Sequence, residues 1–239
     1  MAAEPTHARP ERRSPHSAAI EDYAKAIYVL AQRRDGEPVG TSELADRLGV
    51  TPSSASAMLK RLDERGLLRH QLYKGVTLTE AGEKVALEVI RHHRLLEAYL
   101  SDVLGMPWDR VHEEAEVLEH YISEDLESLI AAKLGDPSHD PHGDPIPGPG
   151  LEPPAEDRSR SLSEVEAGEV VTFTRVSDAD PDMLRYLDER GIKPGVRLAI
   201  LGQEPFKGPL LVEAVGAEHA LGGDLLRRMR VVDGPDAGA

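Results

Sequence analysis

The feature that most constrains the fold is an ordered series of three helical patterns followed by a two-strand pattern. Apolar residues recur at helical spacing over residues 20–34, and shorter helices are predicted over residues 41–48 and 52–65. Two strand-like runs at residues 67–72 and 76–79 then form a hairpin. This order predicts a winged helix-turn-helix; a plain three-helix domain with a capping serine cluster is the alternative.

The second helix of such a pair enters the major groove of DNA with its N-terminal end first. Here that end carries short hydroxyl side chains that can reach bases or phosphates, and two cations follow one to two turns later, where phosphates are expected. A further lysine lies at the tip of the predicted hairpin. The predicted DNA-contacting residues are Thr51, Pro52, Ser53, Ser54, Ser56, Lys60, Arg61 and Lys74.

The net charge of −15 is unevenly distributed along the chain. Residues 1–79 carry 12 Lys and Arg against 10 Asp and Glu, whereas residues 80–135 carry 5 against 13. A weakly basic front and an acidic middle suggest DNA at one end and cations further along. Because the front is only weakly basic, specific contacts or a dimer are needed to hold DNA.

Behind the hairpin the sequence predicts one long helix to about residue 104, two helices within residues 108–134 with a bend near Ser123, and then strand-like runs. The fold class is therefore mainly α with small β elements. The predicted divisions are a disordered arm (1–19), a winged helix-turn-helix (20–79), a helical metal-binding and dimerisation domain (80–135), a Pro-rich linker (136–161) and an SH3-like small β-barrel (162–232).

Histidines and carboxylates recur at helical spacing in the acidic middle of the chain. Side chains three or four residues apart share one helix face, so two helices together can surround an ion. Imidazole and carboxylate without sulfur suit Mn(II) or Fe(II), and also admit Co(II), Ni(II) or Zn(II). The alternative is an ordinary solvated helix face. The residues concerned are His93 and Glu97 on the long helix, and His112, Glu116, Glu119 and His120, which are expected to form one stripe of the next helix.

Four stretches and a linker signature make the chain resemble the diphtheria toxin repressor family, in its manganese-sensing branch with an SH3-like (FeoA-like) C-terminal domain. They are IEDYAKAIYVL, TPSSASAMLKRLDERGLL, RHHRLLEAYL and VHEEAEVLEH, followed by DPHGDPIPG. The resemblance runs from about residue 20 to residue 147 and includes the C-terminal domain.

The resemblance implies two metal sites. The first matches Asp22, Glu116, Glu119 and His120; the iron-sensing branch has Met and Cys at the positions of Asp22 and Glu116, so carboxylates there favour Mn(II). The second matches His93, Glu97 and His112, with Asp178 and Asp180 as its ligands from the C-terminal domain. Compact members of the family with a paired-metal centre carry an acid where this chain has Lys25, so two separated sites are expected. His139 and His142 are interpreted as non-ligands, and His92 as a surface residue.

The implied function is that of a repressor that binds palindromic operator DNA as a homodimer when loaded with Mn(II), and so controls metal-homeostasis genes. An Fe(II)-responsive repressor of the same family is one alternative, and a winged-helix regulator with an organic or protein ligand is another. A metalloenzyme is disfavoured because the chain has no Gly-rich phosphate loop and no Ser-His-Asp arrangement. The C-terminal domain has three candidate partners, namely the metal site, the linker and a protein segment.

Composition excludes several other classes. No stretch approaches the ~18 apolar residues that a membrane helix needs, and the first residues lack the apolar run of a secretory signal. The chain has no cysteine, which excludes disulfides, thiolate zinc sites and thiol catalysis. These observations favour a cytoplasmic protein with no membrane partner.

Overall fold

The computed structural model describes residues 16–34, 36–71, 74–155, 157–206 and 208–234. They form two compact units, which are described separately. The first contains the described residues of Met1–Leu95, Ala115–Asp136 and Pro147–Pro153; the second contains those of Leu96–Glu114, Pro137–Ile146 and Pro154–Ala239. Within these described residues, no helix is both long and apolar enough to cross a membrane.

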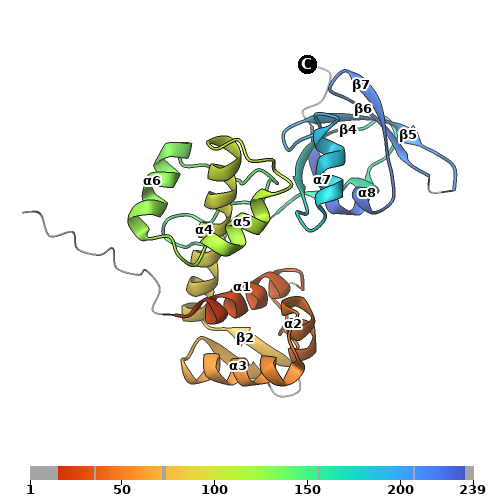
Figure 1. The fold of residues 1–239 in the computed structure, drawn as a ribbon. Helices are drawn as coiled ribbons and strands as arrows, with labels where there is room; N and C mark the ends of the chain where they lie inside the picture. Colours follow the sequence, from red (N-terminus) through yellow and green to blue (C-terminus); the bar gives the residue numbers. More distant parts are fainter. Residues whose placement is uncertain (1–15, 35, 72–73, 156, 207, 235–239) are drawn as a thin grey trace, which may run out of the picture. The chain divides into compact units, whose positions relative to one another are not determined.

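The first unit begins with the predicted winged helix (Figure 1). Its elements are α1 (Ala18–Gln32), α2 (Thr41–Leu48), α3 (Pro52–Glu64), β1 (Leu68–Gln71) and β2 (Gly75–Leu78). Gly49 ends α2 in the left-handed conformation, and Pro52 occupies the first turn of α3. The end of α2 and the start of α3 are those that the sequence predicts. The predicted disordered arm (1–19) extends too far, because its last two residues belong to α1, which begins at Ala18. Residues 1–15 of that arm lie outside the described residues.

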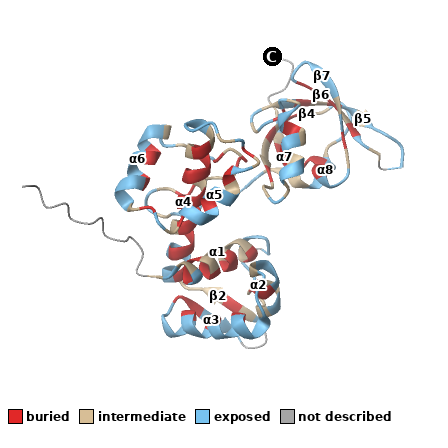
Figure 2. Ribbon diagram, in the orientation of Figure 1, coloured by how far each residue is buried: buried red, intermediate tan, exposed pale blue. Residues whose placement is uncertain are grey.

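The core of the winged helix consists of apolar side chains that face inward from all three helices and from the hairpin (Figure 2). Val39 exchanges two backbone hydrogen bonds of 2.9 Å with Val76 of β2 and so forms an isolated antiparallel bridge to the hairpin. Gly75 is required there, because a Cβ atom at this position would lie 2.2 Å from the Val39 carbonyl oxygen. The wing is therefore fixed to the segment that precedes α2.

Three further helices follow the wing: α4 (Glu80–Asp102), α5 (Val111–Leu118) and α6 (Glu124–Leu134). Ser123 caps the N-terminus of α6 by accepting a hydrogen bond from the Leu126 backbone, so the predicted bend is a complete break. The prediction that a helix starts at Trp108 is wrong, since α5 begins only at Val111. Both α4 and α5 contribute residues to both compact units.

The second unit is built on an antiparallel sheet with the strand order β3-β8-β4-β5-β6-β7. Its elements are β3 (Arg160–Ser161), a 3-10 turn η1 (Leu162–Glu164), β4 (Val170–Val176), α7 (Pro181–Asp188), β5 (Arg197–Gln203), β6 (Leu210–Ala214), β7 (Ala217–Leu221), α8 (Asp224–Arg228) and β8 (Met229–Asp233). The predicted fold class is confirmed: helical N-terminal regions precede a small antiparallel sheet domain. The strand-like runs expected in this part of the chain, GEVVTFTRV, VRLAIL and LLVEAV, correspond to β4, β5 and β6, and the short helix expected near residues 183–190 corresponds to α7. The strands β3, β7 and β8 and the helix α8 were not expected.

The core of this unit extends beyond the sheet. Trp108 packs into the same apolar cluster as Phe173, and its indole nitrogen donates a 3.2 Å hydrogen bond to the Leu184 carbonyl. One part of the predicted linker is packed, because His142 is buried and its carbonyl accepts a 3.0 Å hydrogen bond from the Val176 backbone. The last two residues of the predicted linker form β3.

The two phenylalanines of the chain provide a matched test of this core. Phe173 is 0% exposed and Phe206 is fully exposed, so Phe173→Ala should lower the free energy of unfolding by about 3–5 kcal/mol, whereas Phe206→Ala should have little effect. Urea denaturation followed by circular dichroism measures both. Equal losses in the two variants would contradict the assigned core.

Candidate metal centre

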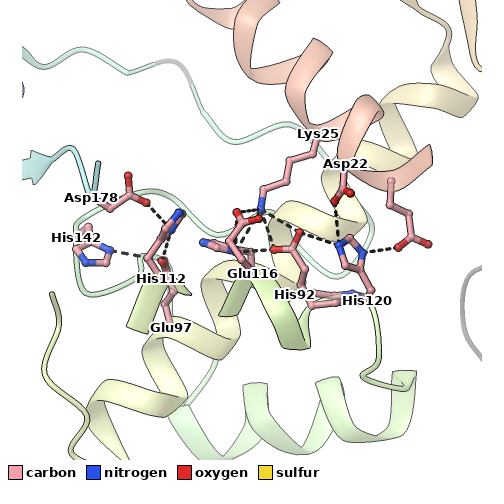
Figure 3. A network of polar contacts seen from close by, with 12 residues as sticks. Asp22, Lys25, His92, Glu97, His112, Glu116, His120, His142 and Asp178 are labelled. Atoms are coloured by element: carbon pink, nitrogen blue, oxygen red, sulfur yellow. Dashed lines mark hydrogen bonds and ion pairs between the residues drawn. The ribbon is translucent and has the colours of Figure 1, made fainter. Parts of the chain in front are cut away.

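The first cluster of potential metal ligands joins α1 to the turn that follows α5 (Figure 3). Asp22, Glu119 and His120 each offer a ligand atom within 4.8 Å of the others. His120 Nε2 lies 3.0 Å from Asp22 Oδ1 and 3.6 Å from Glu119 Oε1. One imidazole and two carboxylates from two separate segments are a chemically suitable set for a hard divalent ion.

The orientation of His120 is fixed from its other ring nitrogen. Nδ1 lies 2.7 Å from Oε2 of Glu21, a carboxylate that is 4% exposed and adjacent to Asp22. Burial opposes the charged form of His120, but the hydrogen bonds to Asp22 and Glu21 outweigh it and raise its pKa to about 10. Carboxylates that hold the second nitrogen of a ligating histidine are common supports of metal sites. Sequence analysis missed Glu21, which lies on the buried face of α1.

A second set of groups adjoins the first and shares Glu119 with it. His93, Glu116 and Glu119 also offer ligand atoms within 4.8 Å of one another. His93 Nδ1 lies 2.5 Å from Glu119 Oε2 and 3.7 Å from Glu116 Oε1. The ammonium of Lys25 contacts all three side chains. Burial opposes the charged form of Lys25, but the carboxylates of Glu119 and Glu116 outweigh it and raise its pKa.

The arrangement differs from the predicted single stripe in one physical respect. Because α5 ends at Leu118, Glu119 and His120 project from a turn rather than from the helix that carries Glu116. The structure therefore brings Asp22, Glu119 and His120 together, whereas Glu116 joins the group of His93. Spacing alone could not show this, because the helical pattern continues through the turn.

A further cluster lies within the second compact unit. His112 Nδ1 is 2.9 Å from Asp178 Oδ2 and 3.2 Å from Glu97 Oε1, and hydrogen bonds to these two carboxylates raise its pKa to about 10. Glu97, which is 1% exposed, also forms a group with Asp140 and His142. His93, expected to share this site, lies one turn before Glu97 on α4.

The positions of Asp180 and His142 differ from those expected for the C-terminal half. Asp180 is not part of it, because its carboxylate caps α7 by accepting hydrogen bonds from the backbones of Asp182 and Met183. His142, interpreted from sequence as a non-ligand, lies in the cluster with Nδ1 3.6 Å from Glu97 Oε2. Its Nε2 donates a 2.8 Å hydrogen bond to the Trp108 carbonyl, which leaves Nδ1 facing the carboxylate.

The expectation that His92 is a surface residue is wrong. It is 4% exposed, with Nδ1 2.9 Å from the Glu119 carbonyl and Nε2 3.1 Å from Glu127 on α6. Arg91 donates 2.7 Å and 2.6 Å hydrogen bonds to Glu127 and to the Pro147 carbonyl. These buried contacts support the turn that carries Glu119. His139, the other histidine interpreted as a non-ligand, lies beside Ser138, to which its ring is hydrogen-bonded.

The predicted DNA-contacting side chains are exposed. Lys74 immediately precedes β2, and the others lie at the start of α3 or along it: Thr51, Pro52, Ser53, Ser54, Ser56, Lys60 and Arg61. The Thr51 hydroxyl accepts a 3.2 Å hydrogen bond from the Ser54 backbone and caps the helix. This capping positions the N-terminus of α3 whatever further contacts the hydroxyl makes.

A winged helix whose first helix carries a potential ligand of a sulfur-free cluster is an arrangement suited to a metal-responsive DNA-binding protein. Comparison with known families supports this class. Residues 16–76 match the model "Iron dependent repressor, N-terminal DNA binding domain", residues 79–148 match "Iron dependent repressor, metal binding and dimerisation domain", and residues 160–233 match "FeoA domain".

Individual relatives agree with the family models. The "Iron-dependent repressor IdeR" of Mycobacterium tuberculosis (strain ATCC 25618 / H37Rv) is 35% identical over 191 residues, which cover 75% of this chain and 82% of that protein. A solved structure described as "Manganese-dependent transcriptional repressor complex with manganese" is 43% identical, with a TM-score of 0.79 and coverage of 90% of this chain and 99% of that one. The "Crystal Structure of ScaR with bound Zn2+" is 31% identical, with a TM-score of 0.72 and coverage of 90% and 99%.

The chain belongs to the iron-dependent repressor family, the family of the diphtheria toxin repressor. The family resemblance inferred from the sequence is thereby confirmed. The protein is a metal-dependent transcriptional repressor and not an enzyme. The DNA-binding and dimerisation models imply DNA and a second copy of the chain as its partners.

The contact between Glu21 and His120 gives a testable consequence. Removing the carboxylate in Glu21→Ala should weaken Mn(II) binding about 10- to 100-fold, because the His120 ring loses its orienting acceptor. Glu21→Gln keeps an acceptor oxygen and should restore part of the affinity. Isothermal titration calorimetry with Mn(II) measures all three proteins; unchanged affinity in folded Glu21→Ala would exclude this positioning role.

Proposed function

We propose that the protein is a manganese-responsive repressor that binds palindromic operator DNA as a homodimer. The observation that carries this proposal is the meeting of Asp22 from the winged helix with Glu119 and His120 in one sulfur-free cluster. An ion held there neutralises the carboxylates and ties the DNA-binding helices to the helical region behind them.

The donor chemistry fits such an ion. The proposed ligands of the first site are Asp22, Glu116, Glu119 and His120. To act as a ligand, Glu116 must turn from its present partners toward the ion. The proposed ligands of the second site are Glu97, His112, Asp178 and His142, with Asp140 and His93 beside them. Carboxylate-rich sets without sulfur favour Mn(II) over softer metals, and a 43% identical solved structure is described as a manganese complex.

Fe(II) is the alternative ion. Relatives that are 35% identical are described as iron-dependent repressors, and imidazole with carboxylate also suits Fe(II). Co(II), Ni(II) and Zn(II) are expected to act as surrogates in solution. The comparison of ions in the binding experiment below separates these cases.

The proposed action on DNA follows from the position of α3. Its exposed N-terminal residues enter the major groove, while Lys60, Arg61 and Lys74 contact phosphates. Two such helices in a dimer meet half-sites about one helical turn, ~34 Å, apart only if their spacing is fixed. The bound ion fixes α1 and with it α3, so DNA binding depends on metal.

An exposed apolar surface on α5, α6 and the turn between them supports the homodimer. Such a surface is unusual on a monomer and typical of an interface between copies. Its most exposed members are Val117, 62% exposed, Tyr121, 70% exposed, and Leu129, 68% exposed; Leu118 and Leu126 are also exposed.

Metal-dependent DNA binding tests the proposal. Duplexes with a randomised core of about 30 base pairs, three turns of DNA, are selected on the full chain in Mn(II), and an inverted repeat should be enriched. Binding of the enriched duplex should then be at least about a hundredfold tighter in Mn(II) than in EDTA. Anaerobic Fe(II) is the matched comparison, and equal binding in EDTA would contradict the proposal.

Two carboxylates provide a matched pair of variants for the same assay. Glu119→Gln should abolish the stimulation of DNA binding by Mn(II), because it removes a charged ligand that is buried at the centre of the cluster. Glu113→Gln, on the exposed face of α5, should retain it. Stimulation that survives in Glu119→Gln would remove Glu119 from the site.

Substitution of an exposed leucine by aspartate tests the proposed dimer surface. Leu129→Asp should convert the dimer to a monomer in sedimentation velocity and weaken operator binding, because a carboxylate would be buried in an apolar interface. Val215→Asp, which places the same charge at a position 61% exposed in the second unit, is the control. An unchanged dimer in Leu129→Asp would move the interface elsewhere.

A further inference from the structure

Lys25 is placed unlike an ordinary surface lysine. Its side chain is 16% exposed, and Nζ lies 2.7 Å from Glu116 Oε1 and 2.8 Å from Glu119 Oε2. The same nitrogen is 3.0 Å from Glu119 Oε1 and 3.3 Å from His93 Nδ1. Figure 3 shows the Lys25 side chain directed at Glu116. By contrast, Lys84 on α4 is 58% exposed and contacts a carboxylate one turn away.

The partners of Lys25 are the members of one of the ligand groups described above. His93, Glu116 and Glu119 have ligand atoms within 4.8 Å of one another, and the ammonium contacts each of these side chains. A cation of the chain thus occupies the position at which this group would hold a metal ion. Two carboxylates brought this close require a positive charge between them.

The burial of Glu119 increases its need for a nearby positive charge. Its side chain is 0% exposed, so water cannot solvate its charge, and an unpaired buried carboxylate would destabilise the fold. The ammonium of Lys25 supplies hydrogen bonds to both of its oxygens. Lys25 therefore supplies to Glu116 and Glu119 the positive charge that a bound cation would supply.

The same contacts oppose the binding of a metal ion. Glu119 belongs both to the group of Asp22 and His120 and to the group that Lys25 occupies. A divalent ion ligated by Glu119 would lie close to the ammonium in a poorly solvated site, where like charges repel strongly. The ion must also take Glu116 from Lys25 if all four proposed ligands are to act.

We propose that Lys25 is an intramolecular competitor of the divalent ion, which holds Glu116 and Glu119 in the metal-free protein and releases them on binding. The inference rests on the proposed metal-responsive function and specifies how its threshold is set. Lys25 raises the metal concentration at which the repressor responds, while it keeps the empty site folded.

A supporting role and a competing role for Lys25 predict opposite changes in Mn(II) affinity when Lys25 is replaced. If Lys25 supported the carboxylates in the loaded protein, its loss would weaken metal binding. If it competes, removal of a charge-assisted hydrogen-bonding partner should tighten Mn(II) binding about 10- to 100-fold. The direction of the change therefore decides between the two roles.

The experiment compares the full chain with Lys25→Met, which keeps the length of the side chain and removes its charge. Free Mn(II) is measured by its electron paramagnetic resonance signal during titration, and thermal unfolding is followed in EDTA. We expect Lys25→Met to bind Mn(II) more tightly and, without metal, to unfold at a lower temperature. Lys84→Met, which breaks an exposed ion pair, should change neither property.

Lys25→Arg is the second variant, because it keeps the charge and should keep Mn(II) affinity near that of the unmodified chain. Far-ultraviolet circular dichroism with Mn(II) present establishes that each variant is folded. Unchanged or weaker Mn(II) binding by folded Lys25→Met overturns the competitor role alone. If the unmodified chain and all variants fail to bind Mn(II), the proposed manganese-responsive function fails as well.

Discussion

The buried carboxylate of Glu119 is the group on which the arrangement of the first unit depends. A charge with no access to water must be satisfied by neighbours, and its neighbours come from distant parts of the chain. Lys25 reaches it from α1, and His93 reaches it from α4. The DNA-binding helices and the helical region are thus joined through one anion rather than through apolar packing alone.

The backbone of the same residue is held as firmly as its side chain. The Glu119 carbonyl contacts His92, whose other nitrogen faces Glu127, and Glu127 in turn accepts a hydrogen bond from Arg91. These groups are buried, so each needs its partner to avoid the cost of desolvation. The turn after α5 is consequently a defined structure, and its two potential ligands point toward α1.

Local sequence signals predicted the DNA-binding half well. Gly49 marks the end of α2 and Pro52 marks the start of α3, because the backbone preferences of these residues act within one turn of the chain. The end of α5 carries no such signal, since VHEEAEVLEH continues the helical pattern past Leu118 and the break is stabilised by contacts with α1 and α4.

The differences between the expected and the observed positions of two candidate-site residues have the same origin. Asp180 precedes a proline, which is a local signal for a helix cap that outweighs its proximity to Asp178. His142 lies in a Pro- and Gly-rich segment, whose composition suggests exposure, yet its ring stacks on Trp108. Which side chains of an irregular segment become buried is decided by packing against distant residues.

The absence of sulfur from both clusters has a chemical consequence beyond the choice of ion. Thiolate ligands pass through sulfenic to sulfinic and sulfonic acids when peroxide is present, and a sensor built on them reports oxidants as well as metals. This chain has no cysteine, and its clusters offer only carboxylate oxygen and imidazole nitrogen. The candidate ligands lack that route of oxidation, so oxidants that would inactivate a thiolate site leave this donor set chemically intact.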